Sequence, residues 1–443
     1  METKFKPHLS VVFLGHVDSG KSTTAGHFLK KCGLVDKKLF EKMCQEAKNL
    51  GKQSFKYAYV FDRLKSERER GLTQDCKSLN FETENKNFTL VDAPGHKKYM
   101  KNMITALSQV DAVILVVDAT VGTFEKGFKK QGKIRELAII ASAYGAKQMI
   151  VLVNKMDVSS VDYSQARYNR IKDKMNPFLR RLGYHSSAFH FIPISAWFGQ
   201  NLMELDTQSM GWYTGPTLYQ ALERLQEPKR ATDQPFRLAV RDVYNVYGVG
   251  IVVRGVVASG TLSEGNQMVL SPTGGIFQAR SILCHGKRIK EAQCGQFASV
   301  NLKYLSSRYI KRGMVLGHIT NDPPCIVLDF TARIYVVNHP TQIRPGYEPV
   351  IDCHTSHITC KIDRFLQKIN KNGRLLEKSP TSLRTGDHAI VHMIPLQPFC
   401  VEPYHKIPTL GRIIIRDMSI IVGIGSIQST NKSKIPITKL KKK

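Results

Sequence analysis

Eight residues near the start of the chain combine glycine, lysine and serine in a spacing that suits phosphate chemistry. Residues 15–22 are Gly-His-Val-Asp-Ser-Gly-Lys-Ser, in which the second glycine is followed directly by Lys and Ser. Gly15 and Gly20 let the backbone turn so that successive N–H groups converge on phosphate oxygens. Lys21 would reach the β- and γ-phosphates, and the Ser22 hydroxyl would bind Mg²⁺. The sequence therefore predicts a site for a nucleoside triphosphate and its magnesium ion.

A second motif, Asn-Lys-Met-Asp at residues 154–157, selects the base. The Asp157 carboxylate can accept two hydrogen bonds from guanine, one from N1–H and one from the 2-amino group, and adenine cannot supply this pair. Asn154 would face the other edge of the base, and the Lys155 stem would lie along its ring. Because a buried carboxylate left unpaired is costly, we expect discrimination of roughly 10⁴ or more. The predicted nucleotide is GTP, with GDP as its product.

A third motif, Asp-Ala-Pro-Gly-His at residues 92–96, suits the chemistry of hydrolysis. The Asp92 carboxylate can hold Mg²⁺ through water, and the Gly95 N–H can contact a γ-phosphate. His96 stands where a water-orienting group is required. Thr73 can place its hydroxyl on the same metal ion. We expect the two loops that carry these residues to close on GTP and to relax on GDP.

The residues expected around the nucleotide lie in four short segments, the last of which would offer backbone amides to guanine O6. They are Gly15, His16, Val17, Asp18, Ser19, Gly20, Lys21, Ser22, Thr23, Asp92, Ala93, Pro94, Gly95, His96, Asn154, Lys155, Met156, Asp157, Ser195, Ala196 and Trp197. The expected magnesium ligands are Ser22, Thr73 and Asp92. The expected catalytic residue is His96.

Apolar runs place these motifs at the ends of strands. Leu9–Leu14 predicts a buried strand, and Lys21–Cys32 predicts a helix after it, so the first motif has the strand, loop and helix that it needs. The other motifs follow the strand-like runs Phe88–Val91, Met149–Val153 and Phe191–Ile194. Because ligands bind at the carboxyl ends of parallel strands, the motifs are expected to meet at one edge of a sheet.

The pattern of elements changes after about residue 225. The first part alternates strands with helical stretches such as Gly132–Tyr144, which predicts a mostly parallel sheet covered by helices. The second part has short β-branched runs separated by glycine-containing turns, which predicts antiparallel barrels. We expect strands at Asp242–Gly255, Val256–Leu262 and Gly265–Leu270. The expected domains are a GTP-binding domain at 1–227, β-barrels at 235–322 and 328–430, and a basic flexible tail at 431–443.

These motifs together resemble the family of eukaryotic elongation factor 1-alpha, and the resemblance covers nearly the whole chain. Further segments carry it: Ser54–Ala58, Glu67–Thr73, Lys101–Thr105, Asp352–Thr355, Leu410–Arg412 and Arg416–Met418. The resemblance implies an α/β P-loop GTPase domain followed by two antiparallel β-barrel domains. It also implies GTP, GDP and Mg²⁺ as ligands, and aminoacyl-tRNA, the ribosome and a guanine-nucleotide exchange factor as partners. Delivery of aminoacyl-tRNA to the ribosomal A site, with GTP hydrolysis on release, is the function that it implies.

The charge of the chain points independently to a polyanionic partner. The 443 residues carry 65 Lys and Arg against 36 Asp and Glu, a net charge of +29, which favours RNA. Basic clusters occur at Lys129–Lys133, Lys147, Arg180–Arg181, Lys287–Lys290 and Lys311–Arg312. No apolar run is long enough to span a membrane, and the N-terminus lacks an apolar signal segment. We expect a cytoplasmic protein with reduced thiols.

Cys353-His354-x-x-His357-x-x-Cys360 has ligand types and a compact spacing that could suit zinc. However, Pro349–Ile362 also fits one extended strand, where neighbouring side chains point to opposite faces and cannot converge on one ion. We favour the strand.

Departures from the family pattern leave alternative functions open. Residues 255–260 are Gly-Val-Val-Ala-Ser-Gly where the family usually has Gly-Arg-Val-Glu-Thr-Gly, and residues 295–297 are Gly-Gln-Phe where Gly-Asp-Asn is typical. In the related bacterial factor, polar groups around these strands hold the aminoacylated end of tRNA. The alternatives are a ribosome-rescue GTPase, or a paralog that binds RNA or filaments with GTP as a switch or structural ligand. A GTPase subunit of sulfate activation is more remote, because its small substrate leaves the basic excess unexplained.

Overall fold

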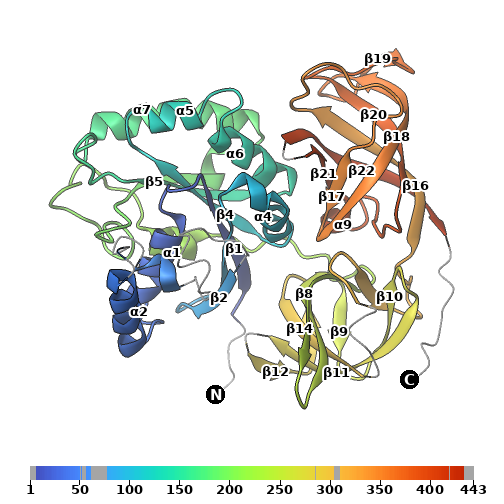
Figure 1. Cartoon of the computed structure of the whole chain (residues 1–443), viewed down its shortest axis with the longest axis horizontal. Helices are drawn as coiled ribbons and strands as arrows, with labels where there is room; N and C mark the ends of the chain where they lie inside the picture. Colours follow the sequence, from blue (N-terminus) through green and yellow to red (C-terminus); the bar gives the residue numbers. More distant parts are fainter. Residues whose placement is uncertain are drawn as a thin grey trace. The chain divides into compact units, whose positions relative to one another are not determined.

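A computed structural model describes residues 6–49, 51, 56–60, 77–284, 286–303, 310–418 and 420–433. Contacts divide the chain into two units, Met1–Pro228 and Lys229–Lys443 (Figure 1). Within the described ranges, no helix is long and apolar enough to cross a membrane.

The first unit is built on a six-stranded sheet of order β2-β3-β1-β4-β5-β6. Its strands are β1 (His8–Gly15), β2 (Lys77–Glu82), β3 (Asn87–Asp92), β4 (Ala112–Asp118), β5 (Gln148–Asn154) and β6 (Phe189–Pro193). Only the β2–β3 pair is antiparallel. Strands β1 and β4 are buried along their whole length, as expected for central strands of a sheet with both faces covered. The predicted mostly parallel α/β domain is confirmed.

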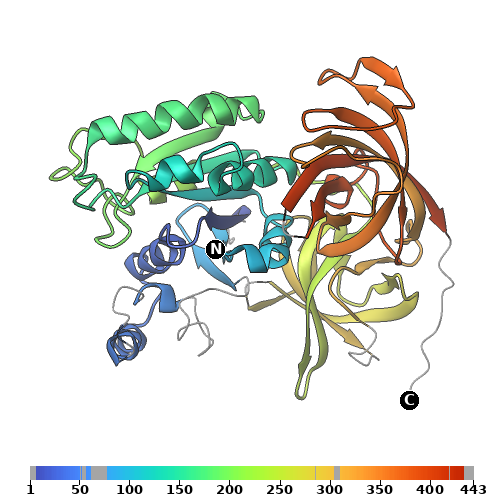
Figure 2. The same ribbon diagram turned by 45° about the horizontal axis from the view of Figure 1, so that its top comes forward.

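Helices cover both faces of this sheet (Figures 1 and 2). Alternate residues of β1, among them Leu9, Val11 and Phe13, pack with helices α1, α2 and α8 in one apolar core. Helices α5, α6 and α7 lie on the opposite side from α1 and α2. The helical elements are α1 (Lys21–Lys31), α2 (Lys37–Asn49), η2 (Ala58–Val60), η3 (Lys97–Tyr99), α4 (Met100–Leu107), α5 (Thr123–Gly127), α6 (Lys133–Ala143), α7 (Gln165–Arg181), η4 (Ser186–Ala188) and α8 (Leu218–Arg224).

Strand β6 forms one edge of the sheet, and two tyrosines close part of that edge. The Tyr168 hydroxyl donates to the backbone carbonyl of Phe191 at 3.0 Å. The Tyr213 hydroxyl shares its proton between the same carbonyl, at 3.2 Å, and the Pro216 carbonyl, at 2.9 Å. Pro193, two residues further on, has no N–H to offer. These features reduce the ability of β6 to pair with a strand from another molecule.

The second unit contains two antiparallel barrels. In the first, the order β10-β15-β7-β8-β14-β11 closes through a further β10–β11 pairing. Its strands are β7 (Arg237–Val246), β8 (Gly250–Ser259), β9 (Thr261–Ser263), β10 (Gln267–Ser271), β11 (Gly275–Cys284), β12 (Lys287–Ile289), β13 (Glu291–Gln293), β14 (Phe297–Lys303) and β15 (Val315–His318).

In the second barrel the order β17-β21-β22-β16-β20-β18 closes through the β17–β18 pairing. Its elements are β16 (Ile326–Val336), β17 (Val350–Cys353), β18 (Ser356–Ile369), β19 (Leu375–Lys378), β20 (His388–Pro395), α9 (Pro408–Gly411), β21 (Arg412–Asp417) and β22 (Ile420–Ser433). The prediction of two antiparallel barrels is confirmed. Strand β22 runs to Ser433, so the first three residues of the expected tail continue the barrel, and residues 434–443 lie outside the described ranges.

Two predicted strands are wrong because each is a hairpin. Asp242–Gly255 contains the turn between β7 and β8, where Gly248 and Gly250 both have positive φ, at 75° and 99°. Pro349–Ile362 contains the turn between β17 and β18, where His354 has φ of 44°. Val256–Leu262 is also wrong as one strand, since β8 ends at Ser259 and β9 begins at Thr261.

A buried ion pair joins the two barrels into one unit. The Arg237 guanidinium of β7 is fully buried and lies 3.1 Å from Glu402, which is 1% exposed. The Thr355 hydroxyl of the second barrel donates to the Val240 carbonyl of the first, at 2.7 Å. A small apolar cluster lies between the barrels beside these contacts: Ala239, Ala258, Val315, Cys400, Ile407 and Leu410.

Candidate nucleotide-binding site

The predicted motifs meet at the carboxyl edge of the parallel sheet. Strand β1 lies between β3 and β4, so the chain leaves β1 where the strand order reverses direction. Phe13 is in register with Asp92, and Gly15 with Val116. This switch point is where open α/β sheets bind ligands.

The loop between β1 and α1 has the backbone shape that a phosphate site needs. Asp18 and Gly20 both have positive φ, at 60° and 89°. A β-carbon on Gly20 would collide with the side-chain amide of Asn154, so only glycine fits there. Gly20 is the N-cap of α1 and makes no side-chain capping hydrogen bond. The first N–H groups of an α-helix have no acceptor within the helix itself, and they point toward an anion placed at its N-terminus.

Lys21 is buried at the centre of this loop. Its ammonium donates to the His16 carbonyl at 2.8 Å. Burial lowers the pKa of Lys21 from 10.5 to about 8, although Asp92 and Asp18 oppose the shift. A β-carbon on Gly95 would lie 2.5 Å from the Lys21 ammonium. The lysine and Gly95 are thus neighbours, as a shared contact with one γ-phosphate requires.

Two of the three expected magnesium ligands lie together. The Ser22 hydroxyl donates to the Asp92 carboxylate at 2.6 Å, and Asp92 is fully buried. A hydroxyl and a carboxylate are the oxygen ligands that Mg²⁺ prefers, so these residues fit the ion. Thr73, the third expected ligand, lies outside the described residues.

Asn154 connects the phosphate loop with the segment expected to meet guanine O6. Its amide nitrogen donates to the Ser19 carbonyl at 2.8 Å, and its amide oxygen accepts from the Ala196 N–H at 2.9 Å. The side chain is 2% exposed. We expected Asn154 to face an edge of the base; the structure gives it a connecting role that the motif alone does not reveal.

The Lys155 and Asp157 side chains follow the end of β5. The Lys155 ammonium donates to the Asp118 carboxylate at 2.7 Å, and Lys155 has φ of 67°. Asp118 ends β4 directly beside Asn154 in the sheet register. Asp118 was not among the expected site residues, although it directly follows the apolar run Ala112–Val117, as Asp92 follows Phe88–Val91. Asp157 is half-buried beside them.

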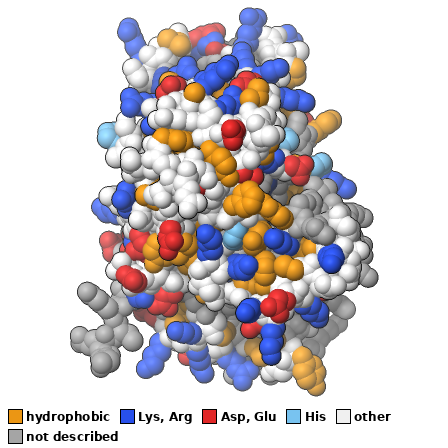
Figure 3. Space-filling view, turned by 90° about the vertical axis from the view of Figure 1, so that its left-hand side faces the viewer, with side chains coloured by type: hydrophobic (Ala, Val, Ile, Leu, Met, Phe, Trp, Pro, Cys, Tyr) orange, Lys and Arg blue, Asp and Glu red, His pale blue; other side chains and the backbone are white. Residues whose placement is uncertain are grey.

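The segment from Ser195 to Trp197 packs against α1 and the residues before η2. His27 Nδ1 lies 2.8 Å from the Ala196 carbonyl, and the His27 ring stacks on Tyr57 at 3.9 Å. The Lys56 ammonium lies 4.5 Å from the centre of the Trp197 ring. Burial lowers the pKa of His27 to about 4, so this contact is made by a neutral ring. Hydrophobic side chains gather in the middle of the face shown in Figure 3, with lysines and arginines around them.

His96 is exposed at the start of η3. Its Nδ1 accepts from the Lys98 N–H at 3.1 Å, which leaves Nε2 as the protonated nitrogen of a neutral ring. The ring lies 6.2 Å from that of Tyr99. An exposed imidazole whose Nε2–H has no partner among the described residues can orient a water molecule.

The other predicted residues lie in the same loops. Ser19, Ala93, Pro94, Ser195 and Met156 are buried, Val17, Ser22 and Thr23 are half-buried, and His16 and Asp18 are exposed. Trp197 is 36% exposed.

The cysteine and histidine pairs at 353–360 have separate partners in the β17–β18 hairpin. His354 Nε2 lies 3.0 Å from the Cys400 carbonyl, and His357 Nδ1 lies 2.7 Å from Asp352. Burial lowers the pKa of His354 to about 4. No group of three or more potential metal ligands occurs among the described residues. These side chains stabilise the hairpin.

A phosphate loop at the switch point of a doubly wound sheet, with Asn-Lys-Met-Asp after a neighbouring strand, defines a P-loop GTPase. The model of the Elongation factor Tu GTP binding domain matches residues 6–227, and the GTP-eEF1A C-terminal domain-like model matches residues 329–428. The chain is 46% identical to elongation factor 1-alpha of Euglena gracilis and 44% identical to that of Stylonychia lemnae. Each alignment covers 432 residues and 97% of both chains.

The chain therefore belongs to the elongation factor 1-alpha family of translational GTPases, and it hydrolyses GTP. Among solved structures, the GTPase-like domain of Ski7 from S. cerevisiae bound to GTP has a TM-score of 0.80 at 18% identity. That match covers 95% of this chain and 97% of the Ski7 chain. At this identity the likeness concerns the fold alone.

Proposed function

We propose that this GTPase binds aminoacyl-tRNA in its GTP form, delivers it to the ribosomal A site and hydrolyses GTP on release. The observation that carries the proposal is the alignment with elongation factor 1-alpha, which extends over 97% of the chain and so includes both barrels. The net charge of +29 supports a large polyanionic ligand. We further propose the domain limits 1–227, 235–322 and 328–430, an exchange factor as partner and a place in the cytoplasm beside ribosomes.

The nucleotide would be held by residues of the loops that follow the parallel strands. The first N–H groups of α1 and the Lys21 ammonium would bind the β- and γ-phosphates. Asp157 would accept the two hydrogen bonds from guanine. Ser22, Asp92 and Thr73 would hold Mg²⁺, which when bound neutralises charge on the phosphates.

Gly95 and His96 would act as the switch and the trigger. The Gly95 N–H would bind the γ-phosphate, and the closeness of Gly95 to the Lys21 ammonium supports this role. His96 would then orient the attacking water once the ribosome fixes its ring. A positioning group of this kind contributes roughly 10²-fold or more to the rate.

One feature of the first barrel favours a second candidate, a specialised paralog that binds RNA without reading its aminoacyl group. Phe297 of β14 is 7% exposed and pairs with Val256 of β8. The guanidinium groups of Arg254 and Arg241 lie 4.5 and 5.3 Å from its ring centre. An aromatic ring with two cations thus stands where the family has small polar residues.

The test is protection of the aminoacyl ester of tRNA from hydrolysis, compared between GTP and GDP forms across a salt series. We expect GTP-dependent binding that weakens steeply with salt, since phosphate contacts release counterions. We also expect a smaller preference for aminoacylated over deacylated tRNA than is typical of the family. Phe297→Asn, which restores the family residue, is the matched variant and should increase that preference.

Two outcomes would contradict parts of this proposal. Strong GTP-dependent protection by the unaltered chain would show that the pocket is built from other residues. No tRNA binding in either form, with GTP turnover intact, would overturn delivery and favour the second candidate.

A further inference from the structure

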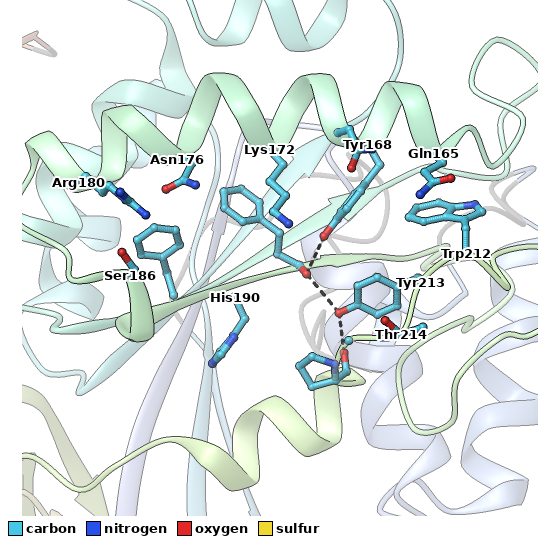
Figure 4. Close-up of a pocket in the computed structure, with 15 residues that line it drawn as sticks. Gln165, Tyr168, Lys172, Asn176, Arg180, Ser186, His190, Trp212, Tyr213 and Thr214 are labelled. Carbon is cyan, nitrogen blue, oxygen red and sulfur yellow. Dashed lines mark hydrogen bonds between the residues drawn. The ribbon is translucent and has the colours of Figure 1, made fainter.

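A groove of about 450 Å³ lies in the first unit between α7 and the loop 212–216 (Figure 4). It is formed by residues that the nucleotide site does not use. The volume lies within the range of small-ligand sites, about 300–1,000 Å³.

The floor and one end of the groove are aromatic. Phe189 and Phe191 of β6 face α7, with ring centres 5.8 Å apart at nearly a right angle. Trp212 lies at the opposite end of the groove from Arg180 (Figure 4), and its ring centre is 5.2 Å from that of Tyr168. Trp212 is half-buried, so part of its ring can meet a planar ligand.

The lining is cationic and contains no acid. Lys172 and Arg180 come from the same face of α7, and both are exposed. Gln165, Asn169 and Asn176 of α7 add side-chain amides. None of the 15 described residues that line the groove is Asp or Glu. An anion with a planar polar ring matches this set of cations, amides and aromatic faces.

Helix α7 carries further exposed cations, which lie on the side of the helix turned away from the groove. Arg170, Lys174 and Arg181 are also exposed, and Asp173 is the only acidic residue within the helix. At a rise of about 1.5 Å per residue, the 17 residues of α7 extend over about 25 Å. Lys172 and Arg180, the two cations of α7 that line the groove, are about 12 Å apart along the helix axis, so they can contact two phosphates of one strand.

An extended peptide fits this groove less well than a nucleotide. Strand addition would need the backbone groups of β6, but the Phe191 carbonyl already accepts from the Tyr168 hydroxyl, and the Tyr213 hydroxyl lies 3.2 Å from it. The occupant must therefore be recognised through side chains. Bases of single-stranded RNA are bound by stacking and cations in this way.

We infer that the groove between α7 and loop 212–216 binds an unpaired nucleotide of single-stranded RNA, with the base against the aromatic side chains and the phosphates on Lys172 and Arg180. This site is separate from the proposed tRNA delivery. Because its residues lie outside the nucleotide loops, binding should be the same in the GTP and GDP forms.

The test uses the full-length chain in its GDP form and a short single-stranded oligoribonucleotide. The oligonucleotide is expected to quench tryptophan fluorescence when it binds. The chain has two tryptophans, so the part of this fluorescence quenching that is lost in Trp212→Phe measures the contribution of Trp212. We expect a clear loss of quenching in that variant. Lys172→Ala/Arg180→Ala should weaken binding about 10- to 30-fold at 0.1 M salt and reduce the slope of log K against log salt by about 1.4, for two lost phosphate contacts.

The matched control is Lys129→Ala/Lys130→Ala, which removes the same charge from two exposed lysines between α5 and α6. We expect this variant to keep most of the affinity and the whole Trp212 signal. If both double variants weaken RNA binding equally, the loss of affinity reflects only the change in net charge, and the inference is overturned. No RNA binding, together with binding of an acidic peptide that changes Trp212 fluorescence, would identify a protein partner and also overturn it.

The same variants separate this site from tRNA delivery. Lys172→Ala/Arg180→Ala should leave GTP-dependent protection of the aminoacyl ester unchanged within about twofold. The unaltered chain could fail to protect the aminoacyl ester and still bind the oligonucleotide at Trp212. That result would contradict the proposed tRNA delivery and support the inferred RNA site in the groove.

Discussion

The two units of the chain use polar contacts in different ways. In the first unit the polar contacts of Lys21, Ser22 and Lys155 lie at the carboxyl edge of the sheet, where a nucleotide would exchange them for its own. In the second unit Arg237 and Glu402 are buried between two barrels, where no ligand can replace them. Polar groups at the sheet edge should therefore set ligand affinity, and those between the barrels should set stability.

The largest expected effect tests the edge of the first unit. Asp157→Asn should favour xanthosine over guanosine nucleotides, with a change in preference of roughly 10⁴, because an amide can donate where the carboxylate accepts. Competition binding measures the preference. The control is Asp162→Asn, on an exposed aspartate of the next turn, which should keep the preference for GTP. An unchanged preference in Asp157→Asn would mean that another residue reads the base.

The second test concerns the interface of the barrels. Arg237→Met should lower the free energy of unfolding of the second unit by about 3 kcal/mol, because the buried Glu402 carboxylate loses one of its two cations and keeps only Lys432. GTP affinity should stay the same. Chemical denaturation followed by a probe in the barrels gives the value.

Two further variants in the second unit make this test specific. Arg237→Met/Glu402→Leu should recover most of the stability, since both buried charges are gone. Arg288→Met removes an exposed guanidinium paired with Glu264 and should have no measurable effect on unfolding. Equal losses in Arg237→Met and Arg288→Met would remove the distinction between buried and exposed pairs.

The third test separates binding from hydrolysis within the first unit. His96→Ala should leave GTP affinity within a few-fold and reduce ribosome-stimulated hydrolysis by roughly 10². Lys21→Ala should instead lose binding itself, because it removes the ammonium from the phosphate loop. The test measures the nucleotide affinity and the single-turnover rate of hydrolysis for each variant. An equal loss of affinity in both variants would argue against separate roles for Lys21 in binding and His96 in hydrolysis.

The smallest expected effect concerns pH and the buried lysine. Between pH 8 and 10.5 the unfolded chain keeps a proton on Lys21 that the folded chain has lost, so the free energy of unfolding should rise with pH in this window. Between pH 8 and 9.5 the gain is about 2 kcal/mol. Denaturation of the nucleotide-free chain measures it, and Lys21→Met should flatten this part of the profile. Identical profiles for both proteins would refute the lowered pKa.

Sequence predicted the first unit better than the second. Expected strands at Leu9–Leu14 and Met149–Val153 are found as β1 and β5, one residue longer at each end. Such runs are long, apolar and buried on both faces, so periodicity identifies them without knowledge of tertiary contacts. The helix expected at Lys21–Cys32 ends one residue earlier.

The barrels were harder to predict because their turns decide the strand limits. The turn at His354 contains no glycine or asparagine, and its conformation is stabilised by a contact with Cys400, 46 residues away. The turn at Gly248 does carry the local signal, and the run of β-branched residues around it concealed the break. In the nucleotide site, contacts from distant residues such as Asp118 and His27 also could not be read from motif spacing.

The single side chain of Asn154 joins the loop proposed to bind phosphate to the loop proposed to contact the base. Its amide fixes the Ser19 carbonyl of the phosphate loop with one atom and the Ala196 N–H with the other. Because both hydrogen bonds come from one rigid amide group, a displacement of either loop is transmitted to the other. Substitutions in the two loops should show epistasis, and evolution would have to alter nucleotide specificity and triphosphate affinity together rather than one at a time.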